Sequence, residues 1–374
     1  MLVIMKRIGW FSLSLVIVVS AGCGSDSSTS ISVKGSESHT AVMQVVNNTI
    51  IPRVENFATQ VASLDNQAET FCITINEANL AATQNQWKVV AQAWYEILPF
   101  KFGPMEGGLD INILEPVYSY VDYYRFNKGN DVTLTVRNQV ESWVNSSTPT
   151  TITDTYFSLK AASLVGLLPL EVTLFETMDT QSKVAADLVA EFNAKPRKCQ
   201  VLTGLTYQLQ LHANEILDGW KTDYAQTGIS YRQLLQDDQL SELVENEEGD
   251  SSISKLTVSI QDYFDYLKNR NITTETGQIS ASIWQSVEPS LYVIKEVLAG
   301  TADTSLSLNA IMVNNGFEQT IASVVDNVET LRTAINETNT INFQAAAGIL
   351  DGNFKRDVPD ALGVSLGLNF SDGD

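Results

Sequence analysis

Basic residues and histidines are scarce in this 374-residue chain. It has 23 lysines and arginines against 44 aspartates and glutamates, and only two histidines. The formal net charge of −21 repels nucleic acid and anionic membrane surfaces, which argues against a nucleic-acid partner. A zinc framework of cysteine pairs or clustered histidines is missing, as are a phosphate-binding loop and a G-x-S-x-G elbow. These gaps leave few of the common catalytic classes open.

A long apolar run occurs at the N-terminus, from Trp10 to Val19, and it is too short for a comfortable membrane span. Lys6 and Arg7 precede it, so residues 1–22 read as an export signal. The small residues before Cys23 are similar to a bacterial lipobox, which predicts a lipid anchor on Cys23. Cleavage near Ala21 as an ordinary secretory signal is the alternative. Removal of residues 1–22 would take the formal charge to about −23.

The expected address is the bacterial cell envelope, with the protein attached to the membrane lipid through acylated Cys23. Gly24 and Ser25 follow Cys23 directly, without the aspartate that favours retention at the inner membrane, so we expect attachment to the outer membrane. Residues 23–39 are rich in serine and have few apolar side chains, so we expect a flexible tether there, with His39 exposed.

Only three cysteines are present. Beyond Cys23, the remaining two are Cys72 and Cys199. An exported protein meets an oxidising compartment in which a Cys72–Cys199 disulfide would persist. Two separate buried thiols are the alternative.

Apolar residues recur at spacings of three and four along most of the chain, the pattern of amphipathic helices. Pro52 lies inside one such stripe, where it predicts a kink or a late helix start. Helices are also expected over 80–98 and 197–220, from about Tyr156, and over 310–335. Long helices with short breaks predict an all-α protein built from helical bundles.

One carboxylate, Glu171, stands inside the almost wholly apolar stretch from Leu164 to Phe175. A buried ionised carboxylate is costly unless it is paired, hydrogen-bonded or metal-bound. Gly166 and Pro169 predict a helix that starts near Pro169, with Glu171 close to its positive end. We therefore expect some partner to meet Glu171.

Several of these motifs resemble the imelysin family, whose signature is GxHxxE. Gly166 and Glu171 match that signature, but Leu168 stands at the histidine position. Four other features are similar to motifs of this family. They are the early cysteine at Cys72, the turn motif of Trp94, Gly103 and Pro104, the Arg197-Lys198-Cys199 run and the final Asp-Gly-Asp. The resemblance implies two packed helical bundles with the GxHxxE segment near their shared interface. We place the boundaries at 40–200 and 201–374.

Imelysins have been described as metallopeptidases, but a leucine cannot ligate a metal. The favoured hypothesis is a non-enzymatic envelope lipoprotein associated with iron acquisition, with the iron-uptake machinery as its partner. A metal-dependent peptidase and a surface adhesion or scaffold protein are the alternatives. If iron or another divalent cation binds, Glu171 is the best candidate ligand. His212 and Glu215 share a helix face and form a second candidate pair, although a histidine on an apolar stripe is more often a core residue.

Overall fold

The computed structural model describes residues 29–106, 116–123, 132–237, 252–269, 272, 276–301 and 303–364, without the side chains of residues 29–36 and 154. The export signal, Cys23 and the C-terminal Asp-Gly-Asp motif lie outside these residues. Within the described residues the chain is all-α and no β-strand occurs, so the predicted fold class is confirmed.

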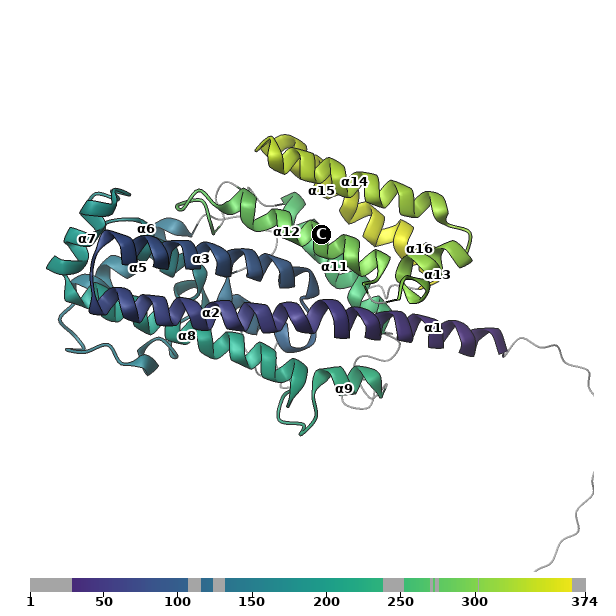
Figure 1. Ribbon diagram of the computed structural model, residues 1–374, viewed down its shortest axis with the longest axis horizontal. Helices are drawn as coiled ribbons and strands as arrows, with labels where there is room; N and C mark the ends of the chain where they lie inside the picture. The colour runs from purple at the N-terminus through teal and green to yellow at the C-terminus, as the bar shows by residue number, and fades with distance from the viewer. Residues whose placement is uncertain are drawn as a thin grey trace, which may run out of the picture.

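The first bundle is built around three long helices, α2, α3 and α8, which lie side by side in Figure 1. Shorter helices complete it. The bounds are α2 (Ile51–Ile73), α3 (Glu77–Ile97), α4 (Val117–Val121), α5 (Thr133–Asn145), α6 (Leu167–Phe175), α7 (Ala185–Ala194), α8 (Pro196–Lys221) and α9 (Tyr231–Gln236).

The second bundle follows in sequence and covers one side of the first (Figure 1). Its helices are α11 (Ser252–Asn269), α12 (Ile283–Ala299), α13 (Leu308–Asn314), α14 (Glu318–Asn336), α15 (Thr340–Gly352) and α16 (Val358–Leu362). Here α15 packs between α11 and α14, and α12 packs on α3 of the first bundle. We call the interface between the two bundles the seam.

The periodicity of α2 and α8 explains why they form the centre of the first bundle. In α2 the buried positions recur at spacings of three and four along 20 Å or more of helix, at about 1.5 Å per residue. The positions with this spacing are Val54, Phe57, Val61, Leu64, Ala68 and Phe71, and Ala58 beside Phe57 is buried as well. The same rule holds in α8, where Leu202, Leu205, Leu209 and Ile216 are fully buried.

The boundary expected between residues 200 and 201 falls inside α8. That helix packs along α2 throughout the first bundle. A tether through residue 39 is wrong, because α1 (Thr29–Val45) already begins at Thr29. Val42 and Val45 are buried and α1 contacts α11 and α13, so the helix has a surface on which to form. His39 is half-buried rather than exposed.

Pro52 lies in the first turn of α2, in agreement with the predicted late helix start, and a π-helical turn (Val46–Ile50) joins α2 to α1. Two further helix predictions differ from the structure. Gly316, with φ +85°, divides the expected helix over 310–335 into α13 and α14. From Tyr156 to the motif the chain forms only short 3₁₀ turns. No helix among the described residues is long and apolar enough to span a bilayer.

Candidate functional site

The site begins at Gly166, which turns the chain into α6. Gly166 has φ +86° and ψ −151°, a conformation that side-chain-bearing residues rarely adopt. A Cβ atom there would lie 2.2 Å from the Val121 carbonyl oxygen and 2.6 Å from that of Tyr120. Only glycine therefore allows the motif to lie this close to the segment of residues 117–122.

Helix α6 is buried along its whole length, and both of its ends are held by hydrogen bonds from α3. The Trp87 indole on α3 donates to the carbonyl of Leu167 over 3.2 Å. Gln84, also on α3, donates to the carbonyl of Leu174 over 2.8 Å. These bonds fix the rotation of α6, and therefore the direction in which Glu171 points.

Glu171 is fully buried and crosses the seam to meet the second bundle. Its Oε2 accepts from the backbone N–H of Gly277 over 2.9 Å. Its Oε1 accepts from the backbone N–H of Ser280 over 2.8 Å and from the Ser280 hydroxyl over 2.7 Å. The predicted partner of Glu171 is thus the turn of residues 276–282 that leads into α12, which we call the seam loop.

The electrostatics of this carboxylate are set by burial. The pKa of Glu171 is raised to about 7, and burial is the largest cause of the rise. The three hydrogen bonds from Gly277 and Ser280 partly offset the effect of burial, and the negative charge of Asp122 adds to it. Asp122 is itself buried and accepts from the Thr276 hydroxyl over 2.8 Å. Two acidic side chains of the first bundle therefore hold the same short loop.

Leu168, at the histidine position of the motif, lies in the apolar core beside Leu167 and Leu170. Its side chain has no lone pair to offer a cation. Within the described residues, no group of three or more histidine, cysteine, aspartate or glutamate side chains could hold a metal ion. Two of the three donors around Glu171 are backbone N–H groups, which do not ligate a cation, and the third is the Ser280 hydroxyl, which donates its proton to the carboxylate. These residues do not fit a protein-held metal at the motif.

His212 and Glu215 lie on α8 and do interact, with 3.2 Å between Nδ1 and the carboxylate Oε2. The other ring nitrogen, Nε2, lies 2.8 Å from the amide nitrogen of Gln208. The ring stacks on Tyr120 with 4.9 Å between centroids. Both ring nitrogens are thus occupied by neighbouring side chains. Tyr120, on which the His212 ring stacks, also places its carbonyl against Gly166.

The family turn residues serve packing elsewhere in the first bundle. Trp94 is fully buried and its ring lies 5.4 Å from that of Phe57. A Cβ on Gly103 would come within 2.6 Å of the Tyr231 ring, and Pro104 fills the space left by Gly219 on α8. These contacts join the turn to the end of α8 and do not involve Glu171.

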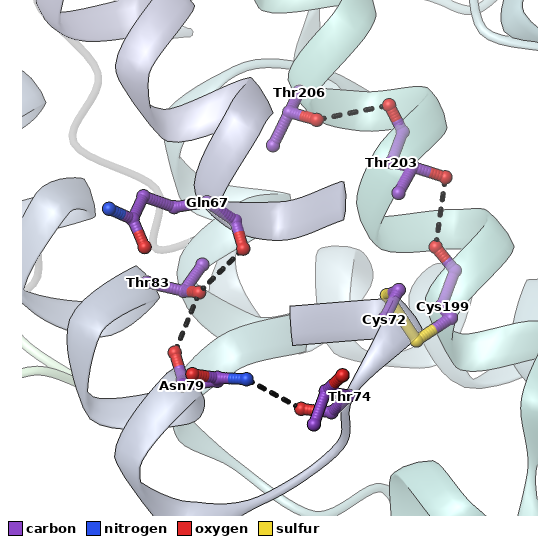
Figure 2. The surroundings of a disulfide bond; sticks show 8 residues. All are labelled: Gln67, Cys72, Thr74, Asn79, Thr83, Cys199, Thr203 and Thr206. Carbon is purple, nitrogen blue, oxygen red and sulfur yellow. Dashed lines mark hydrogen bonds between the residues drawn. A yellow bond between two sulfur atoms is a disulfide. The ribbon is translucent and has the colours of Figure 1, made fainter. Parts of the chain in front are cut away.

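Cys72 and Cys199 are joined by a disulfide with 5.6 Å between their Cα atoms. Figure 2 shows that it connects the last turn of α2 to the first turn of α8. Because 127 positions separate the two cysteines, the bond closes the part of the first bundle that carries α3 to α7 into one loop.

Sequence reasoning missed a buried ion-pair network beyond the C-terminal end of α6. Lys198 is fully buried, pairs with Glu191 over 2.5 Å and donates to the carbonyl of Glu176 over 3.0 Å. The Glu176 carboxylate accepts two hydrogen bonds from Arg137, of 2.6 and 2.7 Å. Burial lowers the pKa of Lys198, whereas the ion pair with Glu191 opposes that shift. A lysine next to a disulfide cysteine gave no signal for this role.

Sequence reasoning also missed the seam loop. Gly277 and Ser280 lie more than a hundred residues from Glu171, and serine and glycine in a turn are common. Only the unexplained burial of Glu171 indicated that such a partner existed.

Comparison with known proteins identifies the family of this chain. The family model named Imelysin (Peptidase M75) matches residues 50–360. The chain belongs to the imelysin family. None of the curated proteins compared with it matches.

Two solved structures share the imelysin fold of this chain. An imelysin-like protein from Psychrobacter arcticum 273-4 has 15% sequence identity and a TM-score of 0.65, with 89% of this chain and 98% of that chain covered. A protein from Parabacteroides distasonis ATCC 8503, described as an iron-regulated protein A precursor, has 12% identity and a TM-score of 0.62, with 88% and 95% covered. At these identities the likeness establishes the fold alone.

Proposed function

We propose that this imelysin is a non-enzymatic, lipid-anchored envelope protein associated with iron acquisition. The observation that carries the proposal is the chemistry at the motif. Leu168 replaces the one motif residue with a nitrogen ligand, and the Glu171 carboxylate is used by Gly277 and Ser280 to join the two bundles. A hydrolytic metal site would need about three ligands and an open position for water.

The proposed association with iron rests on family membership and structural similarity. The chain is an imelysin, and one structural neighbour is described as iron-regulated. The export signal expected over residues 1–22 and the lipid anchor expected on Cys23 support a location in the cell envelope. The acidic composition, with a net charge of −21, suits a protein that works among cations and is compatible with a basic partner in the uptake machinery.

Growth under iron limitation tests the physiological part of the proposal. A strain without the gene should grow more slowly than its parent when iron is chelated, and added iron or the restored gene should remove the difference. A matched strain that carries Cys23→Ser tests the anchor, because the protein should leave the membrane fraction. Equal growth of deletion strain and parent under iron limitation would refute the association with iron.

Two measurements on the purified mature protein test the molecular part. Isothermal titration with iron and with zinc decides whether the protein binds either metal itself. If neither metal shows saturable binding, the protein would act only as a partner of the iron-uptake machinery. Incubation with zinc and an unfolded protein substrate should give no cleavage above background. Metal-dependent cleavage that disappears in Glu171→Ala would establish the peptidase alternative instead.

The closed environment of Glu171 also favours a second candidate, a rigid surface adhesion or scaffold protein. In that case the acid is only a structural acceptor between the bundles. Expression that does not respond to iron supply, together with normal growth of the deletion strain in low iron, would favour this candidate.

A further inference from the structure

Six hydrogen bonds hold the seam loop against the first bundle. Three of them end on Glu171, as described above. The Thr276 hydroxyl donates to Asp122 over 2.8 Å, and the Gln278 amide donates to the Thr133 hydroxyl over 2.9 Å. Lys183 donates to the carbonyl of Ile279 over 2.6 Å. This loop is therefore the point at which polar groups of both bundles interlock.

Other features of the closed loop raise its energy. Ala281 has φ +55° although it carries a Cβ atom. Such a backbone conformation persists in a residue with a side chain only where surrounding contacts impose it, whereas Gly277 adopts its φ of +105° without this cost. The loop also covers two carboxyl groups of like charge, Glu171 and Asp122, whose ionised forms lose water when buried. Favourable hydrogen bonds and unfavourable strain are thus concentrated in the same seven residues.

We propose that Glu171 and the seam loop form a releasable latch: the loop closes over the motif acid, and its local release uncovers Glu171 while the helices on both sides stay folded. The latch is independent of the iron association, because it follows from contacts within this chain. Local openings of this kind are drawn from segments with few buried apolar contacts. In the seam loop only Ile279 contributes to the apolar core.

Release also determines access to the motif. With the loop closed, the oxygens of Glu171 are engaged by Gly277 and Ser280 and are shielded from water. Any ligand or partner that uses this acid must first displace the loop. The second bundle thereby keeps the motif closed by default.

Hydrogen–deuterium exchange of the full mature chain tests the latch. Peptides that cover residues 276–282 should exchange at least about tenfold faster than peptides from the buried centre of α12, since local opening needs less free energy than global unfolding. Glu171→Gln keeps the size of the side chain but turns one acceptor into a donor. It should accelerate exchange of the seam loop by about 10- to 100-fold, because the new amide donor faces a backbone N–H group of the loop and a hydrogen bond is lost, and leave the centre of α12 unchanged.

Glu176→Gln is the matched control. Glu176 is equally buried, lies at the end of the same helix and pairs with Arg137 instead of the loop. Exchange of the seam loop in this variant should equal that of the parent protein. If Glu171→Gln does not fold, Ser280→Ala retains the acid, removes one donor and should give a smaller acceleration.

Three results would overturn the latch. In the first, residues 276–282 of the parent protein exchange as slowly as the centre of α12, so that they open only by global unfolding. In the second, Glu171→Gln accelerates the loop and α12 alike. In the third, Glu176→Gln accelerates the loop as much as Glu171→Gln does.

Discussion

At the scale of single residues, Gly166 and Glu171 hold the motif in place by different means. The glycine allows α6 to start against the carbonyls of Tyr120 and Val121, and the acid joins α6 to the seam loop. The sequence showed that Glu171 needed a partner, because an apolar surrounding makes a lone carboxylate costly. It could not show which partner, since backbone N–H groups are present at nearly every residue.

Gly166→Ala should destabilise the protein by more than about 3 kcal/mol, because strain at positive φ is added to a clash with two backbone carbonyls that cannot move aside. Gly316→Ala is the control: Gly316 has nearly the same φ, +85°, and nothing within 4 Å of its would-be Cβ. That change should cost about 1 kcal/mol. Denaturant unfolding measures both, and equal losses would show that the carbonyl contact is unimportant.

The raised pKa of Glu171 predicts how stability depends on pH. The folded value of about 7 lies above the model value of 4.5, so the folded state binds this proton more tightly than the unfolded state does. The resulting stability is fully present below about pH 4.5 and is lost as pH rises through about 7, by up to about 3 kcal/mol. The free energy of unfolding of the parent protein relative to Glu171→Gln should fall over this range. If the difference in free energy of unfolding between the parent protein and Glu171→Gln does not change with pH, the raised pKa of Glu171 would be contradicted.

At the scale of elements, periodicity predicted the helices whose stripes face one core. The predicted helices over 80–98 and 197–220 correspond closely to α3 and α8. Prediction failed where the outcome depended on contacts distant in sequence. Helix α1 forms in a serine-rich segment because α11 and α13 pack against it, and the break at Gly316 interrupts a stripe that looked continuous.

The buried network on α8 gives a prediction at this scale. Lys198→Met retains a long side chain of similar size but removes the ammonium group, which lies over the Phe192 ring. Glu191 is left as a buried charge with weaker partners, namely Lys195 at 3.3 Å and the backbone N–H of Met178. We expect a loss of about 3 kcal/mol in the free energy of unfolding.

Lys221→Met, at the other end of α8, is the control for that loss. The ion pair of Lys221 with Glu55 is on the surface, with nearly half of each side chain exposed. Such pairs contribute at most about 1 kcal/mol. Thermal and denaturant unfolding of both variants would compare the two pairs, and equal effects would mean that burial does not strengthen the Lys198 pair.

At the scale of the whole molecule, the seam places the second bundle on the first by contacts of several kinds. Helix α12 packs on α3. Arg53 on α2 pairs with Glu296 on α12, and Ser259 on α11 donates to the carbonyl of Pro99 over 2.9 Å. The family resemblance predicted two packed bundles but not where the chain divides, because α8 continues through residue 200 without any local signal for a boundary.

The disulfide acts on the molecule as a whole, because it closes a loop that spans most of the first bundle. With 127 positions between Cys72 and Cys199, the chain-entropy model gives a stabilisation of about 4 to 5 kcal/mol. The double variant Cys72→Ala/Cys199→Ala should lose this amount in denaturant unfolding. Reductant should lower the stability of the parent protein to that of the variant and leave the variant unchanged. Superimposable unfolding curves of the parent protein with and without reductant would mean that helix packing alone holds α2 against α8.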